Sequence, residues 1–203
     1  MGDGGGNGAL LIVKVKSSAV IGIDSYPVDV EVDITPGLPQ LSTVGLPDAA
    51  VKENKDRIKA AIKNSGYRFP EKKVTVNLAP ADIKKEGTAF DLPIAVGILA
   101  AEGLIDPAKL RDYLIMGELS LDGGIKAIHG VLSAAFQAKS SGVAGIIVPA
   151  DNAREAALVE GLPVFGTKTL SEIVEFTAGR KEIRPAKVQV AEVFKKSLQY
   201  SVD

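Results

Sequence analysis

Thr88 and the lysines near it are the residues whose types could do chemistry in this chain. Thr88 lies in the segment Lys85-Glu86-Gly87-Thr88-Ala89, which follows Lys84. A hydroxyl becomes a nucleophile when a neutral amine removes its proton, and a lysine amine is neutral only where apolar neighbours exclude water. Glu86 follows both lysines and favours their charged form. A threonine–lysine hydrolytic site with Lys84, Lys85 or Lys126 as its base therefore stays open, with little support from the residues around it.

Other catalytic chemistry finds no support in the residues. No segment has the glycine, lysine and hydroxyl spacing that surrounds nucleotide phosphates, so this chain alone is not expected to hydrolyse ATP. The chain has one histidine, His129, and no cysteine, so neither a zinc centre nor a cysteine nucleophile is expected. We interpret His129 as a turn or capping residue, and we predict no metal site and no cofactor in this chain.

A basic stretch with aromatic residues lies between positions 51 and 75. Its acidic residues are only Glu53, Asp56 and Glu71, whereas its basic residues are Lys52, Lys55, Arg57, Lys59, Lys63, Arg68, Lys72 and Lys73. Tyr67 and Phe69 lie among them, and a basic helix face with nearby aromatics suits a nucleic-acid backbone. The predicted nucleic-acid contacts are Lys52, Lys55, Arg57, Lys59, Lys72 and Lys73. The alternative is a solvated helix face with the aromatics packed beneath it.

The composition is that of an ordinary globular protein. Of 203 residues, 46% are hydrophobic and 24% are charged, and 24 basic side chains stand against 25 acidic ones. A net charge of −1 gives no general attraction to nucleic acid or anionic lipid, so any such contact must be local. The absence of cysteine and of a signal peptide favours the cytoplasm, and no apolar run has the length of a membrane span.

Hydrophobic periodicity divides the chain into alternating strands and helices. Strands are expected at 10–20, 28–34, 40–44, 73–78, 113–119, 125–128, 145–148 and 162–165. Helices are expected at 47–66, 91–103 and 131–142, after Asn152, and from Thr169 to Gly179, with Asp91, Asn152 and Thr169 as N-caps. The segment 22–27 is expected to be a turn and 79–90 a loop. This order predicts an α/β (α+β) domain with a mixed sheet and packed helices.

Several longer motifs closely resemble one known family. They are Val44-Gly45-Leu46-Pro47-Asp48, Val51-Lys52-Glu53, Asn64-Ser65-Gly66, Val76-Asn77-Leu78-Ala79-Pro80-Ala81-Asp82 and Phe90-Asp91-Leu92-Pro93-Ile94-Ala95. From about Leu11 to Gly179 the chain is similar to the N-terminal domain of the magnesium-chelatase-like AAA+ proteins, the competence-related ComM/YifB family. Members of this family often carry the label of ATP-dependent protease. The resemblance implies a fold like the Lon proteolytic domain, of the ribosomal-protein domain-2-like kind.

Two segments, 85–93 and 117–132, also resemble the framework of the Lon-type proteolytic domain. In that family the first segment carries a nucleophilic serine and the second a lysine base. When the two segments are aligned with that framework, Ala89 takes the position of the serine and Leu132 that of the lysine. Neither side chain can do this chemistry. The resemblance therefore implies a non-catalytic chain whose retained loop serves as an interaction surface. The residues expected in this interaction loop are Lys84, Lys85, Glu86, Gly87 and Phe90.

The same resemblance implies partners outside this sequence. We expect residues 1–9 to be a flexible leader typical of a cloning scar, 10–179 the Lon-like N-terminal domain, and 180–203 a linker toward an AAA+ module. That module would bind ATP and magnesium, assemble as a homo-hexamer and migrate branched DNA during natural transformation. The alternatives are a Lon-related serine/threonine-type peptidase domain and a magnesium-chelatase subunit-like protein. No membrane partner is expected.

Overall fold

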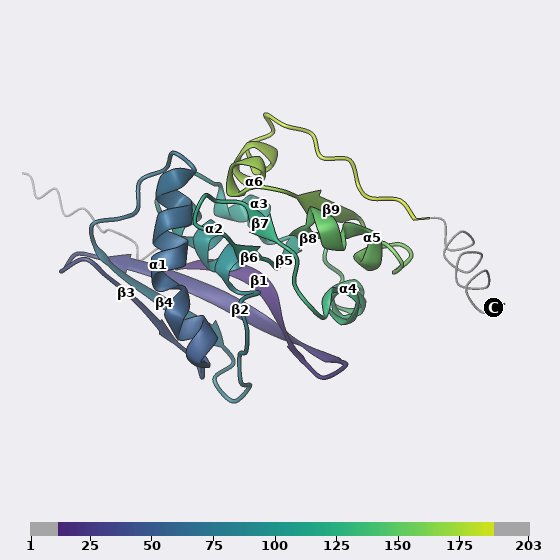
Figure 1. Cartoon of the computed structure of the whole chain (residues 1–203), viewed down its shortest axis with the longest axis horizontal. Helices are drawn as coiled ribbons and strands as arrows, with labels where there is room; N and C mark the ends of the chain where they lie inside the picture. The colour runs from purple at the N-terminus through teal and green to yellow at the C-terminus, as the bar shows by residue number, and fades with distance from the viewer. Residues whose placement is uncertain (1–11, 189–203) are drawn as a thin grey trace, which may run out of the picture.

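A computed structural model describes residues 12–188 and contains a seven-stranded mixed sheet with helices on both faces (Figure 1). The spatial order of the strands is β3 (Gln40–Val44), β4 (Lys73–Ala79), β2 (Asp24–Thr35), β1 (Val13–Ile21), β5 (Tyr113–Ile115), β8 (Gly145–Pro149) and β9 (Val164–Thr167). A small hairpin joins β6 (Glu118–Leu119) to β7 (Ile125–Lys126). The helices are α1 (Ala49–Asn64), α2 (Asp91–Ala101), α3 (Pro107–Leu110), α4 (Val131–Ser140), α5 (Ala153–Ala156) and α6 (Leu170–Thr177), with a 3-10 turn at Ala150–Asn152. This confirms the predicted mixed α/β fold.

The alternation of valines with polar residues sets the faces of β1 and β2. The strands pair antiparallel with Val13 opposite Val32 and Val15 opposite Val30, and all four side chains are buried. Residues of one strand point alternately to the two faces, so the polar residues between these valines lie on the other face. There Lys14 pairs with Glu31 at 2.9 Å between Nζ and Oε1. One face is therefore core and the other is polar.

Two apolar clusters fill the two sides of the sheet. The larger one joins the inner face of β1, β2 and β4 to α1, α2 and α6. The smaller one joins β5, β8 and β9 to α4 and α5, with Leu114, Ile146 and Val148 facing these helices. Ile115 and Ile147, one residue away, belong to the larger cluster, because successive strand residues alternate between faces. The central helix α2 is buried along its whole length from Asp91 to Ala100, as its apolar sequence predicts.

The β1–β2 hairpin is longer than predicted. Strand β2 begins at Asp24, and Ile21 pairs with Asp24 across a tight turn at Gly22, where φ is 63°. Pro27 suggested a turn, but it lies opposite Ser18 in a part of β2 that pairs only with β1. A proline fits there because its missing N–H would have faced an unpaired edge. The predicted pairing of the two strands through a turn near Gly22 is confirmed, but the turn was predicted to extend too far, to Pro27.

The strand expected at 113–119 breaks at Gly117. The Gly117 amide donates to the Ala89 carbonyl at 3.0 Å, and its carbonyl accepts from the Leu92 amide at 3.0 Å. The chain therefore leaves the sheet after Ile115 and crosses the start of α2 before β6. The expected strand 125–128 is shortened to Ile125–Lys126, and the expected strand 162–165 is displaced to Val164–Thr167. The short helix α3 was not predicted.

Of the three predicted N-caps, Asp91 is wrong, and Asn152 takes the N-cap position of α5 without a side-chain capping hydrogen bond. Asp91 is the first helical residue of α2 rather than its cap, and its side chain bonds elsewhere. The Asn152 side chain bonds the backbone of Ile128 in both directions, accepting from its amide at 2.9 Å and donating to its carbonyl at 3.0 Å. Thr169 is confirmed, because its hydroxyl accepts from the Glu172 amide at 3.2 Å.

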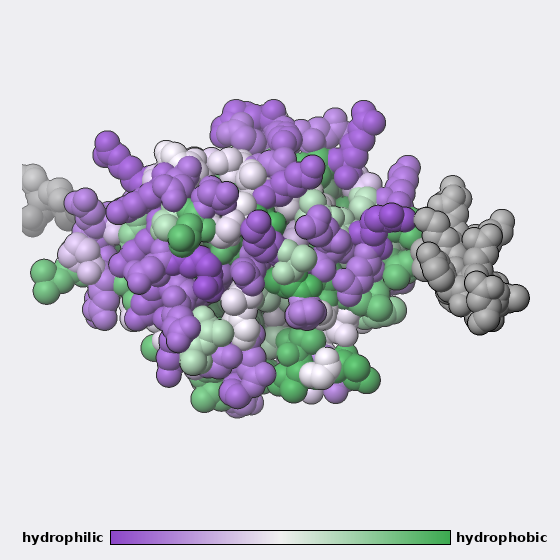
Figure 2. All heavy atoms as spheres, viewed as in Figure 1, coloured by the Kyte–Doolittle hydropathy of each residue, from purple (hydrophilic) through white to green (hydrophobic). Residues whose placement is uncertain are grey.

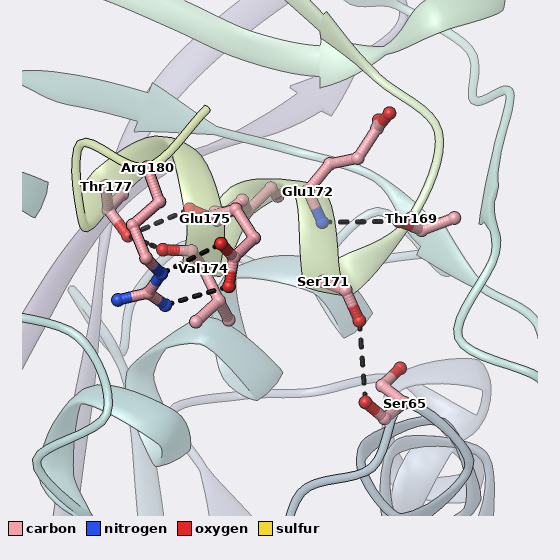
Figure 3. Close-up of polar contacts among 9 residues, drawn as sticks. Ser65, Thr169, Ser171, Glu172, Val174, Glu175, Thr177 and Arg180 are labelled. Atoms are coloured by element: carbon pink, nitrogen blue, oxygen red, sulfur yellow. Dashed lines mark hydrogen bonds and ion pairs between the residues drawn. The ribbon is translucent and has the colours of Figure 1, made fainter. Parts of the chain in front are cut away.

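After α6 ends, the chain contacts the domain at Arg180, which lies against the helix (Figure 3), and again at Ala186. Arg180 donates two hydrogen bonds to the Glu175 carboxylate, both at 2.8 Å. The Ala186 amide then donates to the Val164 carbonyl at 2.8 Å, on the β9 edge of the sheet. The predicted leader at 1–9 and the rest of the predicted linker, 189–203, lie outside the described residues.

Candidate functional site

A pocket of about 540 Å³ lies where the Lon-type resemblance places a proteolytic site. Its walls come from the end of β1, the start of α1, the loop before α2, and the segments on either side of β6 and β7. The lining residues include Ser18, Asp48, Glu86, Gly87, Thr88, Ala89, Glu118 and His129. Ala89 lies at the predicted nucleophile position and presents only a methyl group. Sequence reasoning did not identify the carboxylates of Asp48 and Glu118 as part of this pocket.

Leu132, at the predicted base position, lies in the first turn of α4 and does not line the pocket. Its side chain is half-buried against the smaller apolar cluster. Its amide donates to Glu155 Oε1 at 3.3 Å. Leucine at this position therefore extends the packing of α4.

The Thr88 hydroxyl points to a carboxylate rather than to a lysine. It donates a hydrogen bond to Glu118 Oε2. Lys84 pairs instead with Glu86 at 2.6 Å, and this hydrogen bond raises the pKa of Lys84. Lys126 is exposed on β7 and does not line the pocket. The structure thus brings Thr88 and Glu118 together, but it gives Thr88 no contact with the lysines proposed as its base.

Lys85 is fully buried, contrary to the expectation that it lies in a polar loop. Its ammonium donates to the Gly45 carbonyl at 2.8 Å and to the Pro80 carbonyl. Burial lowers the pKa of Lys85, because the charged form has lost its water. Its backbone bonds both Asp48 and Leu46, at 2.9 and 3.2 Å. Lys85 therefore fastens the β3–α1 loop to the β4–α2 loop.

The predicted interaction loop is only partly a surface. Lys85 and Phe90 are buried, at 0% and 1% exposure, whereas Lys84, Glu86 and Gly87 are exposed. Phe90 was expected at the surface, but it packs into the larger apolar cluster at the start of α2. Of the residues predicted for the interaction loop, only Lys84, Glu86 and Gly87 are therefore accessible to a partner.

Asp91 is a buried carboxylate held by Arg57. It accepts from Arg57 Nε at 2.6 Å, from Arg57 Nη2 at 3.1 Å and from the Leu119 amide at 3.2 Å. Burial raises the pKa of the Asp91 carboxyl, although the Arg57 guanidinium and the Leu119 amide favour its charged form. Arg57 was predicted to contact nucleic acid; its guanidinium bonds Asp91 and so joins α1 to the start of α2. The sequence signal for this burial was a carboxylate at the start of a helix whose other residues are all apolar.

The remaining basic residues lie on the outer face of α1 and on the loop that follows it. Lys52 and Lys63 are exposed, Lys55 and Lys59 are half-exposed, and Figure 2 shows hydrophilic side chains over α1. Lys72 and Lys73 are exposed at the start of β4, and Lys72 Nζ lies 3.8 Å from Glu102.

An open pocket of about 630 Å³ adjoins this face. Lys63, Tyr67, Arg68 and Phe69 line it, and Lys59 Nζ lies 5.6 Å from the centre of the Phe69 ring. Lys63 and Arg68, which the prediction omitted, therefore belong to the basic surface. Tyr67 and Phe69 also pack partly against the core, so each is only half-exposed.

No helix within residues 12–188 combines the length and the apolar character needed to cross a membrane. The family model described as "Subunit ChlI of Mg-chelatase" matches residues 30–152. YifB of Escherichia coli is 43% identical over 173 residues, which is 85% of this chain and 34% of the relative. The competence protein ComM of Haemophilus influenzae is 40% identical over 169 residues, 83% of this chain and 33% of the relative.

A weaker similarity reaches the Lon proteases. The archaeal Lon protease of Methanocaldococcus jannaschii is 30% identical over 103 residues, which is 51% of this chain and 16% of that protein. This chain spans about a third of the length of YifB and ComM. On the family match and these identities, the chain belongs to the ChlI/Mg-chelatase-like family that includes YifB and ComM.

Proposed function

We propose that this chain is the non-catalytic N-terminal domain of an AAA+ ATPase motor, and that it contacts DNA through the outer face of α1. This basic surface consists of Lys52, Lys55, Lys59, Lys63 and Arg68. Its charge and accessibility are the observation that carries the proposal. Cationic side chains spaced along one helix face can follow a phosphate backbone without reading sequence.

The rest of the motor is proposed from the family. Residues 10–179 form the domain and 180–203 form a linker toward an ATPase module, which would bind ATP and magnesium and assemble into a cytoplasmic homo-hexamer. ComM is named a competence protein, and a DNA-contacting domain of a branch-migrating helicase fits that name. Ala89 and Leu132 at the Lon-type positions support a domain that serves the motor by contact rather than by hydrolysis.

The test is fluorescence-anisotropy binding of the domain to single-stranded and branched DNA over a series of salt concentrations. The variant replaces Lys52, Lys55, Lys59 and Lys63 with alanine. The matched control replaces four basic residues away from α1: Lys14, Lys16, Lys109 and Lys139. Wild type and control should bind with affinity that falls log-linearly with salt, and the variant should lose roughly 3 units of slope. Equal binding by variant and control would overturn the proposal.

A peptidase is the second candidate, because the Thr88 hydroxyl lines a pocket and donates to Glu118. The similarity to the archaeal Lon protease favours it, whereas the contacts of Lys84 and Lys85 oppose it. Casein turnover by the wild-type domain that disappears in Thr88→Val would establish this candidate. Its absence in both would leave the contact role. A magnesium-chelatase role rests only on the family's description.

A further inference from the structure

Strand β3 is an open edge of the sheet. Figure 1 shows it as the outermost strand at one end, and among residues 12–188 it is hydrogen-bonded only to β4. The opposite edge, β9, is contacted by the Ala186 amide at 2.8 Å. An open edge presents unpaired donors and acceptors that can pair with a further strand.

The hydrogen-bond pattern shows which groups of β3 face outward. The Gln40 amide donates to the Lys72 carbonyl at 3.3 Å, so the backbone N–H and C=O groups of Gln40 point toward β4. The direction of the backbone N–H and C=O groups alternates from one strand residue to the next. The backbone groups of Ser42 and Val44 therefore also point toward β4. The N–H and C=O groups of Leu41 and Thr43 point to the outer edge.

This edge lacks the charged side chains that natural proteins use to keep strands apart, although Pro39 directly precedes β3. No ionisable residue occurs from Pro36 to Pro47, and β3 contains no proline. Instead, three large apolar side chains are exposed along it: Leu38 at 87%, Val44 at 49% and Leu46 at 53%. Exposed edges are ordinarily protected by charges, prolines or bulges, so an uncharged apolar edge indicates a surface that is covered.

We propose that β3 pairs antiparallel with β3 of a second copy of this chain, about a two-fold axis at Ser42. In this register Leu41 lies opposite Thr43 of the other copy, and the outward groups of these residues form four hydrogen bonds. Gln40 lies opposite Val44 of the other copy. The exposed Leu38 comes beside Leu46 of the other copy at both ends.

The absence of charge on this edge favours a second copy of the chain over a charged peptide as its partner. Two copies meet through segments that carry no charge, so no like charges come together on the axis and no counter-charge is left unpaired. A charged peptide would find no partner for its charges on β3. The edge is also self-complementary in register, as a two-fold interface requires.

A single cysteine tests the register. The chain has no cysteine, so Ser42→Cys introduces one thiol per copy. Ser42 lies opposite itself as a non-hydrogen-bonded pair, with Cα atoms about 4.5 Å apart, which is within the range that a disulfide spans. The matched control is Thr75→Cys, because Thr75 pairs with Ser42, lies on the same face of the sheet and is also half-exposed, but belongs to β4, one strand inside the edge. Under mild oxidation, Ser42→Cys should form a covalent dimer and Thr75→Cys should not. Equal yields from the two variants would overturn the proposal.

Sedimentation equilibrium of the cysteine-free domain gives an independent test, at low and high salt. The wild type should show a monomer–dimer equilibrium. Ser42→Lys should weaken it at least about tenfold by placing two ammonium groups on the axis, while Thr75→Lys should leave it unchanged. A wild type that stays monomeric at all concentrations, or a dimer that Ser42→Lys does not weaken, would show that β3 is not the contact between copies.

Discussion

Replacing Arg57 with alanine is expected to destabilise the domain more than any exposed ion pair would. The change removes both Arg57 bonds from the Asp91 carboxylate, which has 0% exposure, while the hydrogen bond from the Leu119 amide remains. Removing one partner of a buried pair costs about 3–5 kcal/mol. The Arg57 side chain is 25% exposed and water can replace part of it, so we expect about 3 kcal/mol. For a domain of this size that corresponds to a fall in Tm of about 6–12 °C.

The matched control for this change is Arg180→Ala. Arg180 makes the same two-bond contact with a carboxylate, at 2.8 and 2.8 Å, but the side chains of Arg180 and Glu175 are 59% and 40% exposed. Water solvates both charges when the pair is broken, so Arg180→Ala should stay close to wild type. Urea denaturation of the three proteins measures the difference. Equal losses for Arg57→Ala and Arg180→Ala would refute the reasoning from burial.

The penalty of Arg57→Ala should also depend on pH. Burial raises the folded-state pKa of Asp91 above its unfolded value, so between these two values the folded protein binds more protons. The stability that protonation provides is complete below the unfolded pKa and is lost as pH rises through the folded pKa. The difference in unfolding free energy between wild type and Arg57→Ala should therefore shrink on acidification. A difference that is constant or grows would contradict a buried charged Asp91. Adding Asp91→Asn to Arg57→Ala should recover part of the loss at neutral pH.

Two further predictions concern the contact between the two loops. Lys85→Met leaves the Gly45 and Pro80 carbonyls without their donor and should cost about 1–3 kcal/mol in urea denaturation. Because the folded pKa of Lys85 is lowered from 10.5, the wild type should gain stability as pH rises between the two values, and Lys85→Met should lose that gain; an unchanged pH profile would contradict this. Gly45→Ala places a Cβ 2.2 Å from the Leu78 carbonyl oxygen at a φ of +98° and should cost about 2–5 kcal/mol. Gly66→Ala, at a φ of +86° with open space around it, should cost clearly less, and equal costs would exclude the steric reason.

Local patterns in the sequence predicted most of the elements of the fold. The valine alternation of β2, the apolar face of α1 and the wholly apolar α2 are periodic over enough residues to identify their type and burial. The Thr169 cap was predictable because it involves only two residues three positions apart, Thr169 and Glu172. The breaks were less predictable: Gly117 leaves the sheet because it bonds Ala89 and Leu92, which lie more than twenty residues earlier in the chain.

The candidate site was predicted less well because its contacts are distant in sequence. Arg57 and Asp91 are 34 residues apart, and nothing beside Arg57 separates it from the solvated lysines of α1. Lys85 has charged neighbours on both sides, and its burial follows from carbonyls supplied by Gly45 and Pro80. The exposed lysines of α1 were predictable, because helical spacing alone places them opposite the buried residues.

The most direct test of the DNA-contact proposal is an amide ¹⁵N–¹H NMR titration of the domain with single-stranded and branched DNA. The proposal predicts shifts confined to the outer face of α1 and the loop 66–72, with saturation that weakens as salt is added. Lys55 and Arg68 should be among the affected residues, whereas the open edge at β3 and the pocket around Thr88 should be unaffected. Shifts confined to the pocket around Thr88, or no shifts at low salt, would contradict the claim that this basic surface contacts DNA.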